Sequence, residues 1–239
     1  MQPRTVIDSF SIEQIVPYFQ PIYDLDKHKV VRYECLARLI SKDDNIYLPS
    51  EFLYIVNREQ SSAELTQRIL ELSSAYCLPR KMPWSINMFQ TDLRDAGLVN
   101  WIKTLCETAP TGLIGVEIAF DSIKAHAHLV TNLIEKVPNL HVTLDKVSEL
   151  VEPLEDLVAS GVSAIKLSGD LVTRFAKTGE GKPTIIALQQ FCQATSCSLV
   201  AEHIENDNAL DSMVALDIHQ GQGYYLSHPQ GRMASLKQV

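Results

Sequence analysis

Short apolar runs alternate along the chain with longer segments in which apolar residues recur at helical spacing. The runs predict strands, because β-branched and apolar side chains suit an enclosed pleated sheet, and the spaced segments predict helices. The predicted strands are residues 19–25, 30–39, 82–88, 113–119, 141–146, 162–167, 198–201 and 218–226. The predicted helices are residues 49–59, 61–78, 91–108, 123–137, 153–160, 171–176, 183–195 and 206–216.

Eight strands that are mostly separated by helices are typical of a parallel sheet closed into a (β/α)₈ TIM-like barrel. The chain has 239 residues, of which 46% are apolar, and this is enough for one large core. We therefore expect a single α/β barrel domain over residues 16–229. Residues 1–15 are expected to form a lead-in with a short helix, and residues 230–239 a polar tail.

Polar side chains stand near the carboxyl ends of the predicted strands, where barrels of this class place their active sites. The clearest case is the stretch His141–Lys146, in which the apolar run Val142–Leu144 is followed by Asp145 and Lys146. Any one such residue could be a solvated loop edge. Together they would converge in one mouth, which favours a functional site. The candidates are Glu34, Asn87, Glu117, Asp145, Lys166, Glu202 and Gln222.

Charge and cysteine content narrow the class of protein. The net charge of −8 argues against a nucleic-acid-binding surface, which needs a basic stripe. The five cysteines form no Cys-x-x-Cys pair, so buried reduced thiols in the cytoplasm are expected rather than disulfides or a zinc site. No apolar run reaches the length of a membrane span, and the first residues lack the apolar core of a signal peptide. We expect a cytoplasmic protein without membrane insertion.

The letters around the candidate residues resemble the EAL-domain family, bacterial enzymes that cleave cyclic di-GMP to its linear dinucleotide. The resemblance runs from about Tyr18 to Pro229, and its strength lies in the order and joint coverage of the motifs. Glu34-Cys35-Leu36-Ala37-Arg38 stands where the family has Glu-Ala-Leu-x-Arg. The other matching segments are Phe19–Ile22, Leu48–Phe52, Ser85–Met88, Val116–Ile118, Lys166, Ala201–Glu205 and Gln222–Tyr224.

The resemblance implies a barrel whose first strand is antiparallel to the rest, and metal-assisted phosphodiester hydrolysis. In the family two divalent cations, usually Mg²⁺ or Mn²⁺, activate a bridging water. The first cation would be held by Glu34, Asn87, Glu117 and Asp145, with Glu202 as a further ligand or a base. Lys166 would act catalytically by orienting the nucleophile. The ligand-binding residues implied by position are Gln20, Arg38, Lys146, Glu205 and Gln222.

The departures from the family pattern concern the second cation. Lys146 replaces the second aspartate of the family's paired aspartates, and Ser168 replaces a further acid. Phe120 replaces another, and we expect Asp121, one position later, to point elsewhere. A lysine charge about 4 Å from a divalent ion costs on the order of 8 kcal/mol at an effective dielectric near 20. Even if Lys146 turned to solvent, the aspartate would be missing. We expect at most one Mg²⁺ or Mn²⁺, or Ca²⁺, and no second metal.

The function expected is that of a degenerate EAL-domain protein whose phosphodiesterase activity is lost or strongly impaired. It would act as a cyclic di-GMP receptor or as a protein-interaction module, with a protein partner or a homodimer. The alternative is an active metal-dependent cyclic di-GMP phosphodiesterase. His203 replaces a family glycine, with a packing role favoured. The loop 148–153 lacks glycine and contains Pro153, so Leu150, Val151 and Leu154 either present a docking surface or pack beneath the loop.

Overall fold

The fold is described by a computed structural model that covers residue 6 and residues 10–231. The predicted lead-in (1–15) and tail (230–239) lie largely outside the described residues. Strands β1, β9, β8, β7, β6, β5, β4 and β2 pair in that order, and β1 also pairs with β2, which closes the barrel. The predicted barrel is confirmed. The strands are β1 Ile15–Asp24, β2 Lys29–Ile40, β3 Ile46–Tyr47, β4 Trp84–Asn87, β5 Ile114–Ala119, β6 His141–Val147, β7 Ala164–Leu167, β8 Ser198–Ala201 and β9 Gln220–Gly221.

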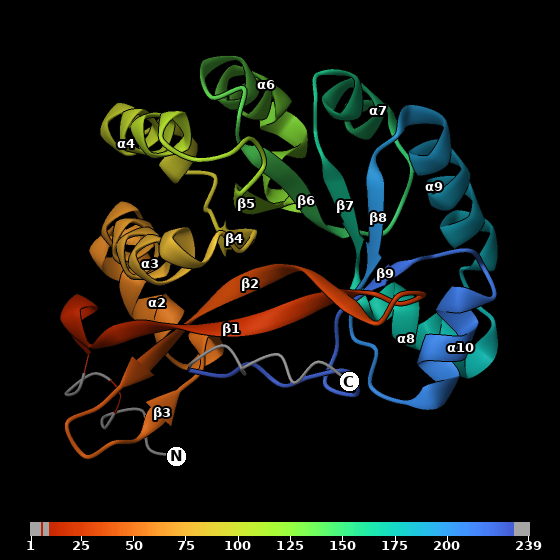
Figure 1. The fold of residues 1–239 in the computed structure, drawn as a ribbon, viewed down its shortest axis with the longest axis horizontal. Coiled ribbons are helices and arrows are strands. Elements are labelled where there is room, and N and C mark those ends of the chain that lie inside the picture. Colours follow the sequence, from red (N-terminus) through yellow and green to blue (C-terminus); the bar gives the residue numbers. More distant parts are fainter. Residues whose placement is uncertain (1–5, 7–9, 232–239) are drawn as a thin grey trace.

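The first strand is antiparallel to both of its neighbours, as expected. β1 pairs with β2 along a long hairpin and with β9 at its far end, where Tyr23 lies opposite Gly221. Figure 1 shows this hairpin running across the barrel between β4 and β9. The two-residue strand β3 was not predicted. It extends the hairpin beyond the barrel, by pairing with Leu39 and Ile40 of β2.

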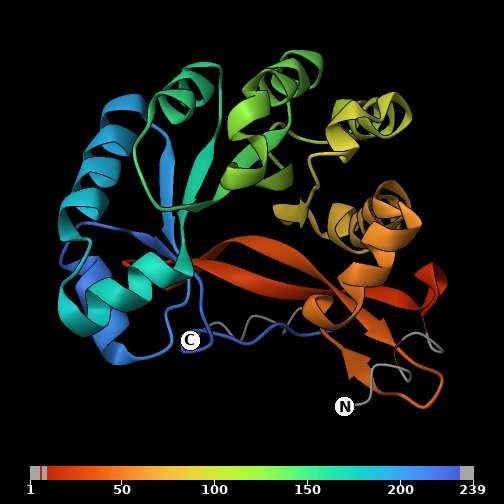
Figure 2. The same cartoon turned by 180° about the vertical axis from the view of Figure 1, so that it is seen from behind.

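Helices cover the outside of the barrel, and α3, α4, α6, α7 and α9 form an outer layer around β4 to β8 in Figures 1 and 2. None of the helices in residues 10–231 combines the length and apolar character needed to cross a bilayer. The helices are α2 Pro49–Glu59, α3 Ser62–Cys77, α4 Ala96–Glu107, α5 Phe120–Ile123, α6 Ala127–Lys136, α7 Glu152–Ala159, α8 Gly169–Thr178, α9 Lys182–Thr195 and α10 Asp207–Val214.

Three predicted elements differ from the structure, and hydrogen bonds of buried Asp92, one of them to a preceding helix, account for the first. The helix expected over 91–108 is broken, because buried Asp92 accepts hydrogen bonds from Thr66 Oγ1 and Phe89 N. Asp95 then caps α4 by accepting from Leu98 N at 2.9 Å. The helix expected over 123–137 is divided into α5, a 3-10 turn at 124–126 and α6.

The last predicted strand, residues 218–226, is reduced to Gln220–Gly221. The chain leaves the sheet there and packs closely against the segment after β8: a Cβ atom at Gly223 would lie 2.0 Å from the carbonyl oxygen of Ile204. Only glycine permits this approach. Ile204 N donates to Gln222 O at 3.1 Å, and Tyr225 N donates to Ile204 O at 3.0 Å. These bonds hold the two segments that carry Glu202 and Gln222 against each other.

His141, at the start of β6 and far along the strand from Asp145, makes acid stability testable. Burial, together with the nearby Arg32 guanidinium, lowers the pKa of His141 to about 3. The folded state therefore resists protonation that the unfolded state accepts below its pKa of about 6.5, so stability is lost as the pH falls from 6.5 towards 3. At pH 5 this one group removes about 2 kcal/mol.

We expect His141→Gln to lose less stability than the parent between pH 7 and pH 5, measured by urea unfolding at both values. His128→Gln, at an exposed position, is the matched control and should behave as the parent. An equal loss in parent and His141→Gln would contradict the assignment.

Candidate functional site

A cavity of about 840 Å³ opens at the carboxyl ends of the strands. This size suits a small-molecule ligand. It is lined by most of the residues predicted for the site, since the parallel register places Asn87 opposite Glu117 and Ala119 opposite Asp145. The predicted residues that line it are Gln20, Glu34, Asn87, Glu117, Asp145, Lys146, Glu202, Glu205 and Gln222.

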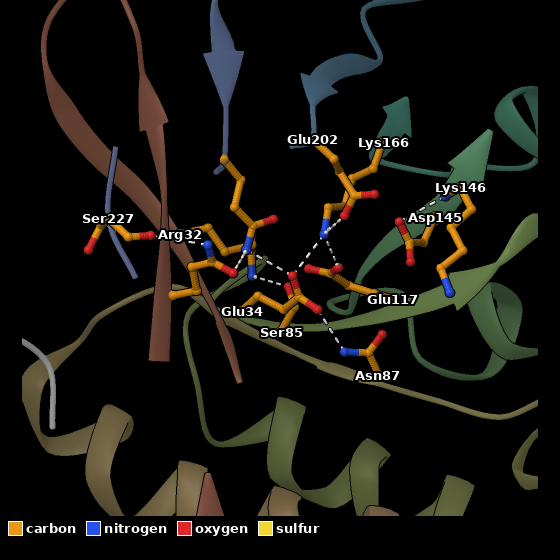
Figure 3. Close-up of polar contacts among 12 residues, drawn as sticks. Arg32, Glu34, Ser85, Asn87, Glu117, Asp145, Lys146, Lys166, Glu202 and Ser227 are labelled. Atoms are coloured by element: carbon orange, nitrogen blue, oxygen red, sulfur yellow. Dashed lines mark hydrogen bonds and ion pairs between the residues drawn. The ribbon is translucent and has the colours of Figure 1, made fainter. Parts of the chain in front are cut away.

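Lys166 lies at the centre of the site, fully buried, and its ammonium group contacts three carboxylates (Figure 3). The Nζ atom lies 2.7 Å from Glu117 Oε2, 2.9 Å from Glu34 Oε2 and 2.9 Å from Glu202 Oε1. A buried ammonium needs such partners, because burial without them is costly. Sequence reasoning predicted Lys166 at the site. It did not predict that its charge holds three glutamates together.

Amide side chains fix the orientation of Glu34. Asn87 Nδ2 donates to Glu34 Oε1 at 2.7 Å, and Gln222 Nε2 donates to Glu34 Oε2 at 2.9 Å. Gln222 Nε2 also lies 3.2 Å from Gln20 Oε1, and Gln20 Nε2 donates to the carbonyl oxygen of Ser227 at 3.1 Å. This chain of hydrogen bonds joins β1, β2 and the segment after β9, so Gln20 and Gln222 are positioning groups as well as lining residues.

The site carries more negative than positive charge, and the pKa values reflect this. Burial, reinforced by Glu34, raises the pKa of Glu117 to about 8. Burial, with Glu202 and Glu34 nearby, raises the pKa of Asp145 to about 6. Burial also opposes ionisation of Glu34, but Lys166 outweighs it and lowers that pKa. Four carboxylates around one buried lysine therefore favour the uptake of protons or of a further cation.

The donor set fits one hard divalent cation. Carboxylate and amide oxygens are the ligands that Mg²⁺, Mn²⁺ and Ca²⁺ prefer. Glu117 Oε1 is buried and has no hydrogen-bond partner, so it is available as a ligand. Across the part of the chain that the structure describes, no three His, Cys, Asp or Glu side chains are already grouped as metal ligands. The three glutamates converge on the Lys166 ammonium, so a cation bound beside them would share these carboxylates with the lysine.

Asp145 and Lys146 both face the cavity because β6 is irregular at this point. The register with β7 shifts between Leu144 and Val147, and Lys146 adopts a left-handed conformation with φ of 60°. In a regular strand the two side chains would point to opposite faces. The Lys146 backbone N donates to Asp145 Oδ1 at 2.8 Å. No ion pair joins the Lys146 ammonium to Asp145 among the described residues.

Arg38 lies differently from expectation, whereas Asp121 and Glu205 lie at the edge of the cavity. Arg38 is buried and does not line the cavity: its Nη1 donates to the Ala37 carbonyl at 2.8 Å, and its guanidinium lies 5.6 Å from the centre of the Tyr18 ring. Asp121, which was expected to point elsewhere, touches the cavity edge, and its carboxylate pairs with Lys124 at 2.8 Å. Glu205 lines the cavity as an exposed rim residue.

The structure also shows how His203 packs and whether Leu154 is available for docking. His203 adopts φ of 54°, and its ring occupies the space beside Gly169, where a Cβ atom would lie 1.7 Å from His203 Nδ1. It therefore packs at the mouth while remaining exposed. Leu154 is completely buried, and Leu150 and Val151 are half-buried against the core. Packing beneath the loop is the arrangement found, so a docking surface that includes Leu154 is wrong.

Sequence reasoning missed Tyr224 and Ser148 as cavity residues. Tyr224 is 52% exposed at the rim, with its ring 4.5 Å from that of His228. Its position directly after Gln222-Gly223 was a usable signal, because those residues were already placed at the mouth. Ser148 follows the irregular end of β6, and nothing in the sequence pattern marks that irregularity.

Known proteins resemble this chain in sequence and in fold. The cyclic di-GMP phosphodiesterase PdeB of Shewanella oneidensis is 22% identical over 227 residues, which are 91% of this chain and 26% of that protein. The chain thus spans about a quarter of that relative's length. The EAL enzyme Bd1971, in a cGMP-bound form, superimposes with a TM-score of 0.83 at 18% identity, covering 95% of this chain and 66% of that one.

The FimX EAL domain of Pseudomonas aeruginosa, solved bound to cyclic di-GMP, superimposes with a TM-score of 0.82 at 16% identity. It covers 97% of this chain, which in turn covers 96% of it. At these identities the superpositions bear on the fold alone. The family model of the EAL domain matches residues 4–229. A match over nearly the whole chain, on a barrel whose mouth holds Glu34, Asn87, Glu117 and Asp145, shows that the chain belongs to the EAL domain family.

Proposed function

We propose that this protein binds cyclic di-GMP as a receptor and has lost, or strongly reduced, the ability to hydrolyse it. The observation that carries the proposal is the side chain at position 146, an exposed lysine that faces the cavity beside Asp145. A cation at this point opposes a second divalent ion, with a cost on the order of 8 kcal/mol at about 4 Å and an effective dielectric near 20.

The neighbouring positions support the same conclusion. Phe120 is buried and lies outside the cavity lining, so it supplies no ligand. Ser168 lines the cavity, but its hydroxyl caps α8 by accepting from Leu171 N at 3.3 Å. The carboxylate of Asp121 is paired with Lys124. Asp170, which also lines the cavity near Ser168, is paired with Arg174 at 2.9 Å.

One divalent cation would be held by Glu34, Asn87, Glu117 and Asp145, with Glu202 adjacent. Bound there, it would supply a positive charge that binds and polarises a phosphate oxygen. The protein's own residues would then act by position: Gln20 and Gln222 keep Glu34 oriented, and Lys166 neutralises the glutamates beneath. Glu205 and Tyr224 at the rim would contact the outer part of a nucleotide. The proposal includes Mg²⁺ or Mn²⁺, or Ca²⁺, at a single site.

Calorimetric titration of the full chain with cyclic di-GMP, in Mg²⁺, in Ca²⁺ and in EDTA, tests this function. Saturable binding of about one nucleotide per chain, with the nucleotide recovered intact, is the expected result. Absence of binding under all three conditions would refute the receptor proposal. Rapid conversion to the linear dinucleotide would identify the protein as an active phosphodiesterase instead.

We also propose a cytoplasmic location and a protein partner or a second copy of the chain. The support for the location is the set of five buried free cysteines and the lack of a disulfide among the described residues. A receptor that does not convert its ligand can transmit a signal only by contacting another molecule when the ligand is bound. The burial of Leu154 means that the contact surface must lie away from that side chain.

A further inference from the structure

Lys146 differs from the other cations around the cavity in making no close ion pair among residues 10–231, although its charge acts on Asp145 and opposes the rise in the pKa of that carboxyl. Lys166 is held by three glutamates. Arg174 pairs with Asp170 and with Glu180, each at 2.9 Å. Among residues 10–231, Lys146 is the one cavity-lining cation for which no ion pair is found. An exposed ammonium beside a cavity is free to bind an anion that enters it.

The backbone at Lys146 fixes the direction of this charge. A left-handed conformation is uncommon for a residue with a side chain and is adopted only where the surrounding structure holds it. It is held by the hydrogen bond from the Lys146 N to Asp145 Oδ1 and by Ser168 N, which donates to Val147 O at 2.9 Å. In a regular strand the Lys146 side chain would point towards the outer helices. The irregularity in β6 points it into the cavity instead.

The surroundings of Lys146 are suited to a phosphate group. Ser148 and Ser168 offer neutral polar groups on the same side of the cavity, and Ser168 lies beside the end of β6 through its bond to Val147. The nearest acid, Asp145, has one carboxylate oxygen engaged by the Lys146 backbone. Asp121 and Asp170 also line the cavity, but each is paired with another cation, Lys124 or Arg174.

We propose that the Lys146 ammonium binds one phosphate group of the dinucleotide directly and supplies the charge that a second divalent ion would otherwise provide. This inference rests on the proposed receptor function and names the side chain that makes it possible. Its consequence is a ligand site that is already partly cationic before any metal binds. Nucleotide binding should then persist when divalent ions are removed.

The test is a titration of the full chain with cyclic di-GMP in EDTA and in Mg²⁺, on four proteins. Lys146→Met keeps a side chain of similar length, in the same left-handed backbone conformation, but removes the charge. We expect this variant to bind about tenfold or more weakly in EDTA, because one charged hydrogen bond is lost. Lys146→Arg keeps the charge and should stay within a few-fold of the parent. Lys42→Met, at an exposed position outside the cavity lining, is the control and should change nothing.

The outcomes separate this inference from the proposed function. If the parent binds and Lys146→Met binds equally well in EDTA, Lys146 is not the phosphate ligand, although the receptor proposal stands. If the parent binds only when Mg²⁺ is present, the metal-independent role is overturned in the same way. If no protein binds under any condition, the receptor proposal itself fails. Thermal unfolding of each variant confirms that the proteins compared are folded.

Discussion

Purified protein is expected to leave cyclic di-GMP uncleaved over hours in Mg²⁺ or Mn²⁺. Typical enzymes turn over 1 to 10³ times per second, and we expect a rate at least ~10³-fold below the lower end of that range. The reason is that one cation alone would have to activate the water and stabilise the leaving oxygen, while Lys146 opposes the second. The measurement is chromatography of the nucleotide after incubation with the protein at known concentration.

The control is the Glu34→Ala variant, which removes the residue that contacts Lys166, Asn87 and Gln222 at once. If the parent completes many turnovers within minutes and this variant does not, the barrel itself is the catalyst. The active phosphodiesterase would then be the correct description, and Lys146 would have to move aside during the reaction. A trace of activity equal in both proteins would instead indicate a contaminating enzyme.

Replacing Lys166 by methionine is expected to lower the free energy of unfolding by about 3–5 kcal/mol at pH 7, because buried carboxylates lose their counter-charge. The ammonium is fully buried and contacts Glu34, Glu117 and Glu202. Methionine fills a similar volume, so the loss measures charge rather than a cavity. Urea unfolding of parent and variant gives the difference directly.

Two conditions should reduce that loss. Carboxyls whose folded pKa lies above the unfolded value, as for Glu117 and Asp145, bind protons in the folded state, so their own contribution to stability rises as the pH falls. Without the Lys166 ammonium these carboxyls gain more from protonation than they do in the parent. The deficit of Lys166→Met should therefore shrink between pH 7 and pH 5.5, and added Mn²⁺ should also shrink it. A deficit independent of both pH and Mn²⁺ would mean that packing, rather than charge, is what the lysine provides.

Lys124 provides a matched control for this experiment. Its ammonium also contacts two carboxylates, at 2.8 Å from Asp121 and 2.6 Å from Glu149, but the side chain is 32% exposed. Solvent weakens such pairs, so Lys124→Met is expected to cost less than about 1 kcal/mol. Comparable losses at both positions would show that burial does not decide the energy of these pairs.

The sequence predicted the parts of the site that follow from regular parallel strands. Asn87 and Glu117 could be placed together because the carboxyl ends of neighbouring strands meet at one edge. The direction of Lys146 could not, because alternation along a strand predicts the opposite face, and an irregularity in β6 overrides it. The same limit applies to Arg38, whose position in a motif does not reveal that it packs on Tyr18.

The errors in the predicted fold also came from interactions between residues that are distant in the sequence. The helical pattern over 91–108 does not indicate that Thr66, on the preceding helix α3, donates a hydrogen bond to the Asp92 carboxylate. The burial of Leu154 depends on how α7 lies against the barrel, which an apolar residue after a loop does not specify. Periodicity thus located most elements, whereas their ends and the orientation of single side chains depended on tertiary contacts.

The pairing of β1 with β9 is expected to form late in folding and therefore to complete the candidate site last. This pairing and the hydrogen bond between Gln20 and Gln222 join residues about 200 positions apart, and contacts of such separation form slowly. The β1–β2 hairpin and the neighbouring parallel strands can form before it. We therefore expect Glu34 to gain its contact from Gln222 only when the barrel closes, so that a partly folded chain would contain the acidic residues before they are held as in the folded site.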